Sequence, residues 1–336
     1  MVTIKEIAKR AGVAPSTVSR VISNDSRISD ATKQRVIKIM NDMSYHPNAI
    51  ARSLVSKSTK TIGIIMPNSA DKAFLNPFFP EALRGIINCV YNEGFCILIT
   101  NGATKEEQIQ SLHGLVRGRR VDGVILMYSS IEDPMLNELK NINIPFSVIG
   151  RPANYENVNY VANDNVQASY DAVEYFISKG HKNIGLINGS MNLVVSIDRY
   201  EGYKKALAEN NITMDEKLIV NSEFIVECGY EGMKRMLSIK NTPSAVLVTD
   251  DLIALGAIKA INESGIRIPQ NISLISFNNT YISQLASPPL TSIDVNAYEL
   301  GFKSAEVLFK TLNNGLEVNK VLVKTEIKER SSVINR

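Results

Sequence analysis

The stretch Ala14-Pro15-Ser16-Thr17-Val18-Ser19-Arg20, near the N-terminus, decides how the first part of this chain folds. Pro15 suits the first turn of a helix, where its missing N–H is not needed. Upstream, Thr3-Ile4-Lys5-Glu6 has the spacing of a capping box, and Gly12 is placed to end the helix that begins there. Downstream, Ser29 is placed to cap a third helix. Two short helices joined by a Gly-containing turn, with a third packed behind them, predict a helix-turn-helix unit.

The charge of this segment indicates what it binds. A three-helix unit of this size could also be a protein interaction module. Residues 1–60, however, contain eleven Lys or Arg against four Asp or Glu, a net charge of +7, while the whole chain is +3. The rest of the chain therefore carries −4 by subtraction. Positive charge concentrated in one small domain is what a polyphosphate partner selects, so we expect double-stranded DNA as a partner.

The same stretch resembles the DNA-binding domain of the lactose-repressor family. The matching positions are Val2-Thr3-Ile4-Lys5-Glu6-Ile7-Ala8, Ala11-Gly12-Val13, Ser16-Thr17-Val18-Ser19-Arg20-Val21, Ser29, Tyr45-His46-Pro47-Asn48 and Ala51-Arg52-Ser53-Leu54. One departure is Ala14, where the family usually has a serine that caps the recognition helix. Losing that cap should cost about 1 kcal/mol, softened here by Pro15.

The resemblance implies roles for single residues. Pro15, Ser16 and Arg20 would face base edges in the major groove, and the planar fork of Arg20 matches the O6/N7 edge of guanine. Thr17, Ser19 and Asn24 would hold phosphates, although solvated helix surface is the alternative for each Ser and Thr. The full set expected at the DNA is Thr3, Pro15, Ser16, Thr17, Ser19, Arg20, Asn24, Ser29, Tyr45, Asn48, Ala51, Arg52 and Leu54.

Composition places the chain among soluble cytoplasmic proteins. Of its 336 residues 44% are hydrophobic and 21% charged. No apolar run approaches the ~20 residues that a membrane helix needs, and the N-terminus lacks a secretory pattern. The three Cys and the three His are scattered, which disfavours disulfides and a metal site. We therefore expect a cytoplasmic protein with no metal, no cofactor and no membrane contact.

Residues 47–60 are predicted to connect a DNA-binding domain, residues 1–46, to a larger core, residues 61–336. Residues 48–55 have helical spacing over only about two turns, and a helix this short is marginal alone in water. A plain connector is one interpretation. The family resemblance implies a hinge helix that folds when two copies meet on DNA, with Leu54 as an apolar wedge in the minor groove.

The large C-terminal part alternates short apolar runs with amphipathic stretches, which predicts α/β architecture with doubly wound parallel sheets. The expected strands are Thr61–Pro67, Cys96–Asn101, Val121–Met127, Pro145–Gly150, Asn183–Asn188, Ala245–Asp250 and Ile272–Asn278. Four of these precede residue 155 and three follow it, so we expect two similar sub-domains. The first would comprise about 61–160 plus 292–320, and the second about 161–290 plus 321–330. In this scheme residues 288–296 return the chain to the first sub-domain, and a strand near 321–327 completes the fold.

Polar residues lie where these strands end. In doubly wound sheets ligands bind at the carboxyl ends of the strands. The strand ends here supply amides, hydroxyls and carboxylates, which suit a polyhydroxylated neutral ligand. Phe78, Phe79 and Phe224 could offer flat faces to sugar rings, with core packing as the alternative for each.

The core also resembles the sugar-binding cores of the same repressor family, which are related to periplasmic binding proteins. The resemblance rests on Asn76-Pro77-Phe78-Phe79, Arg119-Arg120-Val121-Asp122-Gly123, Asp164-Asn165, Arg199, Asp250-Asp251 and Glu329-Arg330. It implies that Arg199 clamps the effector, and that Asp250 and Asn278 bond its polar groups. The family usually has Asp at position 278. The full set expected at the effector is Phe78, Phe79, Asn101, Tyr128, Arg151, Asp164, Arg199, Phe224, Asp250 and Asn278.

Within the family, the chain most resembles maltose or maltodextrin operon repressors of Gram-positive bacteria, through Ile28-Ser29-Asp30, Ser53-Leu54-Val55-Ser56 and Asn163-Asp164-Asn165-Val166-Gln167-Ala168. We therefore expect a homodimeric repressor that a small sugar releases from its operator. A regulator of another sugar, a corepressor mechanism, a sugar transport protein and a sugar-processing enzyme are the rivals. Among catalytic motifs, G-x-G-x-x-G, P-loop, G-x-S-x-G and H-E-x-x-H are all missing from the sequence, so we expect no enzyme.

Overall fold

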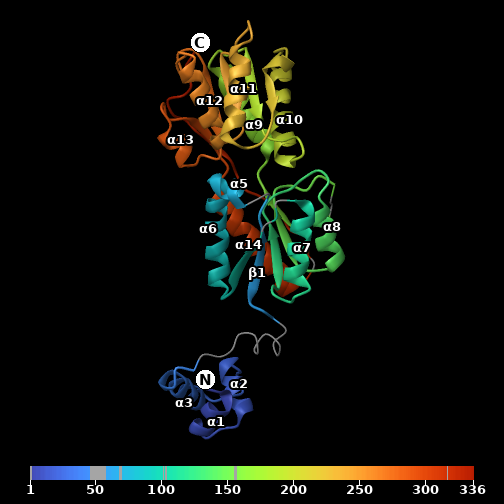
Figure 1. The fold of residues 1–336 in the computed structure, drawn as a ribbon, viewed down its shortest axis with the longest axis vertical. Coiled ribbons are helices and arrows are strands. Elements are labelled where there is room, and N and C mark those ends of the chain that lie inside the picture. The colour runs from blue at the N-terminus through green and yellow to red at the C-terminus, as the bar shows by residue number, and fades with distance from the viewer. Residues whose placement is uncertain are drawn as a thin grey trace. The chain divides into compact units, whose positions relative to one another are not determined.

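The computed structural model describes residues 2–45, 58–67, 70–100, 102, 104–154, 157–315 and 317–336. It contains two compact units, Met1–Thr59 and Lys60–Arg336, and each is described by itself (Figure 1). Among the described residues no helix is both long and apolar enough to cross a bilayer.

The N-terminal unit is a bundle of three helices, α1 (Ile4–Ala11), α2 (Pro15–Ile22) and α3 (Asp30–Asp42). The capping box is confirmed, since Thr3 accepts from the Glu6 N–H and Glu6 accepts from the Thr3 N–H. Gly12 ends α1 in the left-handed conformation at φ 64°. The predicted cap of α3 is wrong: the Ser29 hydroxyl donates to the Thr32 hydroxyl at 3.0 Å and caps no backbone N–H.

The apolar faces of the three helices meet in one small core. Its centre is formed by Ile7, Val18 and Val36, one from each helix, and all three are fully buried. Because these three side chains come from three different helices, their contact requires the helices to pack against one another. This core therefore fixes how α2 is presented to solvent.

The second unit contains two six-stranded sheets. The first has the strand order β11-β5-β4-β3-β1-β2 and is parallel throughout. Its strands are β1 (Thr61–Ile65), β2 (Cys96–Thr100), β3 (Gly123–Leu126), β4 (Phe146–Ile149), β5 (Tyr160–Ala162) and β11 (Lys320–Leu322). The second has the order β12-β10-β9-β8-β6-β7, with only β12 antiparallel. Its strands are β6 (Ile184–Asn188), β7 (Ile219–Asn221), β8 (Ala245–Val248), β9 (Ser273–Phe277), β10 (Thr291–Asp294) and β12 (Glu326–Lys328).

Helices cover both faces of each sheet, which gives two sub-domains of three layers. The first sub-domain has α6 and α14 on one side of β1 and α7 on the other (Figure 1). Its helices are α5 (Ala70–Leu75), α6 (Phe78–Asn92), α7 (Lys105–Val116), α8 (Pro134–Ile142) and α14 (Ala297–Asn314). The helices of the second sub-domain are α9 (Asn165–Ser178), α10 (Val194–Glu209), α11 (Val226–Leu237), α12 (Asp251–Glu263) and α13 (Tyr281–Leu285).

All seven expected strands form, but the expected crossings between sub-domains differ. Residues 291–294, expected to lead back to the first sub-domain, form β10 of the second sheet, since Ser292 pairs with Ser276 and Ile293 with Phe277. The single strand expected near 321–327 is two strands, β11 in the first sheet and β12 in the second. The chain therefore returns to the first sub-domain at α14, and crosses for the last time between β11 and β12.

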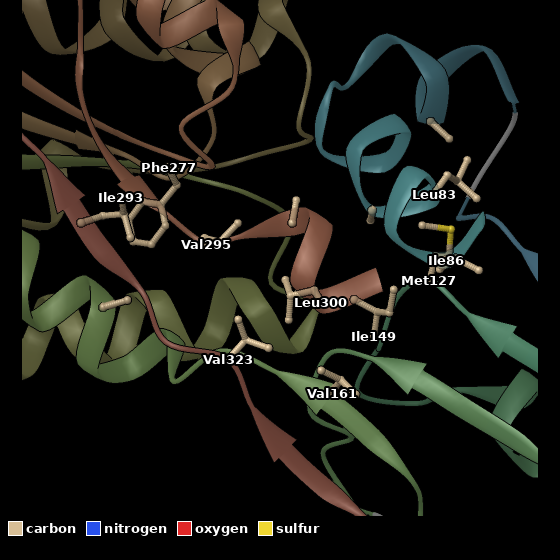
Figure 2. Close-up of a cluster of buried hydrophobic side chains, with 14 of the residues drawn as sticks. Leu83, Ile86, Met127, Ile149, Val161, Phe277, Ile293, Val295, Leu300 and Val323 are labelled. Carbon is tan, nitrogen blue, oxygen red and sulfur yellow. The ribbon is translucent and has the colours of Figure 1, made fainter. Parts of the chain in front are cut away.

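One buried amide joins the three segments that cross between the sub-domains. The side-chain N–H of Asn163, just after β5, donates to the carbonyl of Val295 at 3.0 Å and to that of Val323 at 2.9 Å. Apolar side chains pack around the same point, including Val161 and Leu300 (Figure 2). The crossing segments thus form one bonded and packed bundle at the base of the cleft between the sheets.

Candidate functional site

The exposed surface of α2 matches the expected DNA-reading face. Pro15, Ser16, Ser19 and Arg20 are exposed, while Val18 and Val21 on the opposite face are buried. Pro15 stands in the first turn, and Ala14 makes no side-chain cap, as the sequence indicates. In the first turn of α2 Pro15 has no N–H, and the N–H groups of Thr17 and Val18 donate to the Ala14 carbonyl at 2.9 and 3.3 Å, so among the described groups of this turn the Ser16 N–H is the one that remains available as a donor.

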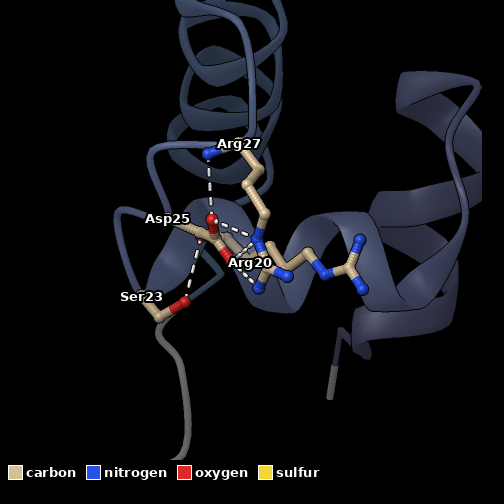
Figure 3. A network of polar contacts seen from close by, with 4 residues as sticks. All are labelled: Arg20, Ser23, Asp25 and Arg27. Atoms are coloured by element: carbon tan, nitrogen blue, oxygen red, sulfur yellow. Dashed lines mark hydrogen bonds and ion pairs between the residues drawn. The ribbon is translucent and has the colours of Figure 1, made fainter.

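Arg20 is left free to contact a partner. Figure 3 shows its guanidinium pointing away from a neighbouring ion pair, in which Arg27 holds Asp25 with a contact of 2.6 Å. The hydrogen bonds from Arg27 hold the pKa of Asp25 well below its usual range, so this carboxylate stays charged. Within residues 2–45, no side-chain acceptor bonds the Arg20 guanidinium. Its guanidinium donors are therefore available to a binding partner.

Other residues of the expected DNA set have local partners or lie outside the described part. The Thr3 hydroxyl is engaged in the capping box, and the Asn24 side-chain oxygen accepts from Lys33 at 3.0 Å. Thr17 is half-buried, and Tyr45 packs against the three-helix core. Asn48, Ala51, Arg52 and Leu54, together with the expected hinge helix, lie outside the described residues.

A cavity of about 770 Å³ lies in the second unit, between its two sub-domains. Such a volume is within the range of roughly 300–1,000 Å³ that small-molecule sites occupy. Eight of the ten residues expected at the effector line it: Phe78, Phe79, Tyr128, Arg151, Arg199, Phe224, Asp250 and Asn278. Asp164 is not among the lining residues: it is exposed, and its carboxylate caps α9 by accepting from the Gln167 N–H at 2.9 Å. Asn101 lies outside the described residues.

Asp250 is the polar centre of the cavity. One of its oxygens accepts from the side chains of Asn76 at 2.9 Å and Asn278 at 2.8 Å, and the other caps α12 through the Leu252 N–H at 2.7 Å. Burial raises the pKa of Asp250 to about 6, despite the bonds that favour its charged form. Asn76 comes from the first sub-domain and Asp250 from the second, so this contact spans the cleft.

The second cross-cleft contact is an ion pair. The guanidinium of Arg151, which follows β4, holds Asp198 on α10 with N–O distances of 2.6 and 3.3 Å. This pairing raises the pKa of Arg151. A backbone bridge between Ser130 and Leu193 lies at the same side of the cleft. The two sub-domains are therefore joined by direct polar contacts around the cavity.

Arg199 lines the cavity and is almost fully buried. Its guanidinium donates to the Asn165 side chain at 3.0 Å and to the Thr249 carbonyl at 2.5 Å, and it lies 4.2 Å from the centre of the Phe277 ring. Burial lowers the pKa of Arg199 to about 10, while nearby carboxylates, Asp250 first, act in the opposite direction. Arg199 is thus a cation at neutral pH, and these two hydrogen bonds already hold its guanidinium in one orientation.

Aromatic rings and neutral polar groups complete the walls. Phe78 and Phe79 pack edge to face with their centres 5.2 Å apart. Phe224 lies against Gly189, where any side chain would collide with the ring. The Tyr128 hydroxyl donates to Gln108, and burial raises its pKa above the usual value. The arrangement offers flat apolar faces beside amides and hydroxyls, which is what a sugar requires.

Sequence reasoning missed several polar lining residues: Asn76, Gln108, Ser129, Ser130, Asp133, Asn163, Asn165, Ser190, Asn192 and Asp198. Asn163 and Asn165 follow the short strand β5, which the sequence pattern did not reveal. Ligands bind at the carboxyl ends of parallel strands, so both residues would have been predicted at the cavity if that strand had been recognised. Asp198 lies inside a helix, where no such rule applies.

Comparison with known proteins identifies both units. Residues 3–48 match the model for bacterial regulatory proteins of the lacI family, and residues 173–333 match that for a periplasmic binding protein-like domain. The HTH-type transcriptional regulator MalR of Streptococcus pneumoniae is 40% identical over 93% of this chain and 93% of its own.

Two solved structures cover almost the whole chain. The lac repressor dimer bound to operator and the anti-inducer ONPF has 25% identity, a TM-score of 0.88 and covers 99% of both chains. A complex of the transcriptional regulator CelR with cellobiose has 27% identity, a TM-score of 0.78 and covers 99% of this chain and 100% of its own. The relatives are transcriptional regulators and not enzymes.

Proposed function

The chain belongs to the lacI family of bacterial regulatory proteins and is a DNA-binding transcriptional repressor, and from this premise we propose that a small sugar controls its affinity for operator DNA. Maltose or a maltodextrin acts as the inducer in this proposal. Support for maltose comes from the likeness to MalR and to a solved structure described as a probable maltose operon transcriptional repressor malR, with 27% identity and a TM-score of 0.75. Support for a sugar in general comes from the cellobiose complex of CelR.

The observation that carries the proposal is the cavity itself. Phe78, Phe79 and Phe224 line it together with the amides of Asn76 and Asn278, which donate to the Asp250 carboxylate. Aromatic faces shield the apolar side of a pyranose ring, and the polar cluster can exchange hydrogen bonds with its hydroxyls. Asn278 in place of the family's usual Asp removes one acceptor and adds a donor toward Asp250.

Operator recognition in this proposal uses α2, one copy per half-site. Arg20 contacts a base edge, with Pro15 and Ser16 beside it, and Thr17, Ser19 and Asn24 bind phosphates. We extend the proposal to Asn48, Ala51, Arg52 and Leu54 as minor-groove and backbone contacts of a hinge helix.

Two copies of the chain are required for a near-palindromic operator, and we propose a homodimer. The lac repressor structure is described as a dimer on its operator. The second unit here exposes large apolar side chains on three of its helices, including Leu75 on α5, Tyr91 on α6 and Leu285 on α13, whose exposed fractions are 69%, 79% and 81%. Such groups are candidates for burial in a partner.

The test is a titration of sugar into a protein–operator complex, followed by fluorescence anisotropy of labelled DNA. Maltose, maltotriose and cellobiose are compared at one ionic strength, because affinity for DNA depends steeply on salt. Release of operator by maltose or maltotriose is the expected result. Tighter binding would instead assign a corepressor, and no response to any sugar would refute a sugar effector.

Reciprocity supplies an independent check. If maltose weakens operator binding by some factor, operator must weaken maltose binding by the same factor. Calorimetric titration of maltose with and without saturating operator measures this factor directly. Identical maltose affinities under the two conditions would exclude allosteric induction.

A further inference from the structure

The ion pair between Arg151 and Asp198 determines whether the cavity offers a positive charge to a ligand. The fork of Arg151 contacts both carboxylate oxygens of Asp198, at 2.6 and 3.3 Å. The Asp198 side chain is 9% exposed, and that of Arg151 is 44% exposed. The carbonyl of Arg151 also accepts from the Ser129 hydroxyl at 2.9 Å, which fixes the backbone behind the pair. The guanidinium that borders the cavity is thus already neutralised by a carboxylate from the opposite sub-domain.

The other cations of the cavity do not offer an anion site. Arg199 is buried, held by two neutral acceptors, and faces the carboxylates of Asp250 and Asp198. Lys105 stands at the exposed first residue of α7. Among the described residues, three cationic and five anionic side chains line the cavity, which gives a net charge of −2.

Carboxylates also occupy helix N-termini that could otherwise attract an anion. Asp133 caps α8 through the Met135 N–H at 3.0 Å, and Asp250 caps α12 at 2.7 Å. The N-terminus of α10 has no side-chain cap, but Asp198 lies one turn inside that helix. An anionic ligand would therefore meet negative charge at each of these three helix ends.

We propose that Asp198 is a specificity-determining residue that makes the cavity accept unphosphorylated sugars and reject their phosphate esters. A phosphate group would have to displace Asp198 from Arg151, and the released carboxylate would then face the phosphate. A neutral hydroxyl needs no such displacement, because it can use donors and acceptors without changing the charge balance. This inference rests on the proposed sugar effector and adds that this sugar is uncharged.

The test compares maltose with maltose 6′-phosphate by calorimetric titration of the full-length protein. Wild-type protein should bind maltose more tightly by about tenfold or more, because like charges brought together in a partly buried site repel strongly. Asp198→Asn removes the charge with little change in shape, and should lower that preference by about tenfold or more. Glu201→Gln is the matched control, since it removes one charge from an exposed position of the same helix, where Glu201 pairs with Lys204.

A second variant protects the test against misfolding of the first. Arg151→Gln leaves the buried Asp198 carboxylate without its cation, and should increase the preference for maltose over its phosphate. In the double variant Asp198→Asn/Arg151→Gln, the gain in phosphate-ester binding shown by Asp198→Asn alone should disappear. The inference is overturned if wild-type protein binds the phosphate ester as tightly as maltose. It is also overturned if folded Asp198→Asn keeps the wild-type preference.

Failure of maltose as the effector can be told apart from failure of this inference. If neither maltose nor its phosphate binds while operator binding is intact, maltose is the wrong sugar. Titration with inorganic phosphate then tests, without any sugar, whether Asp198 excludes an anion from the cavity. Tighter phosphate binding by Asp198→Asn than by wild-type supports the inference, and equal binding overturns it.

Discussion

Replacing Gly301 by Ala should destabilise the core, because α6 and α14 cross there with their backbones in contact. A Cβ atom at Gly301 would lie 1.9 Å from the carbonyl oxygen of Ala82, and one at Gly85 would lie 2.0 Å from that of Tyr298. The obstructing atoms belong to helix backbone and not to flexible side-chain ends. The two helices would therefore have to move apart along their whole contact.

The magnitude follows from two opposing effects. Overpacking costs about 1–3 kcal/mol, and collision with backbone belongs at the upper end. Ala is better than Gly in a helix interior by about 1 kcal/mol. The net effect is a loss of about 2 kcal/mol in the free energy of unfolding. Gly114→Ala is the matched control, since nothing lies within 4 Å of its added carbon in α7, and it should gain about 1 kcal/mol.

Urea unfolding followed by tyrosine fluorescence measures this difference. The chain has no Trp, and of its twelve Tyr only Tyr45 precedes residue 60, so the signal reports the core. Gly301→Ala should also weaken effector binding, because α6 begins at Phe78 and Leu300 of α14 lines the cavity. If Gly301→Ala proved as stable as Gly114→Ala, the two helices would not cross as described, and the reasoning would be refuted.

Two further predictions concern DNA reading and pH. Arg20→Ala should weaken operator binding by about 1–3 kcal/mol, the value of one bidentate base contact, and leave maltose binding intact; equal preference for operator over scrambled duplex in both proteins would contradict the assignment. Burial raises the pKa of Asp250 to about 6 from 3.8, so the folded chain binds a proton that the unfolded chain releases. This carboxyl's contribution to the unfolding free energy is therefore greatest below pH 4, and falls by up to about 3 kcal/mol as pH rises through 6. Urea unfolding at pH 4.5 and 7 should show a smaller pH effect in Asp250→Asn than in wild-type, and an unchanged pH effect would show that Asp250 is not the group responsible.

Local signals in the sequence were sufficient for the first helices, for seven of the strands and for much of the cavity. The capping box of Thr3 and Glu6, and the left-handed turn at Gly12, depend on residues a few positions apart, which a sequence displays directly. Asp250 and Asn278 follow strands β8 and β9, and the parallel topology brings strand ends together wherever the strands lie in the chain. The order of apolar runs and polar residues is therefore enough to predict both side chains at the cavity.

The contacts across the cleft could not be predicted in the same way. Asn76 and Asp250 are 174 positions apart, and Arg151 and Asp198 are 47 apart. Asp164 belongs to a motif shared with the family and was expected at the effector, yet its carboxylate caps α9. A short acidic side chain next to a helix start bonds the nearest free N–H. The second sheet gained β10 from residues expected to be a connection, because partner strands, and not local pattern, decide whether a short segment pairs.

Asn163 shows why these long-range contacts matter for control by an effector. Its single amide bonds Val295 and Val323 on the other two crossing segments, so any change in the arrangement of the two sub-domains must be accommodated by these three bonded segments. The ion pair of Arg151 with Asp198 also joins the two sub-domains, and it favours the arrangement in which these two residues are in contact. A ligand shifts such an equilibrium only through its differential affinity for the open and closed states. The proposed effector must therefore act on contacts made by both sub-domains. Asp250 already accepts hydrogen bonds from Asn76 of the first sub-domain and from Asn278 of the second. One ligand hydroxyl bound to Asp250 can therefore change both hydrogen bonds at once.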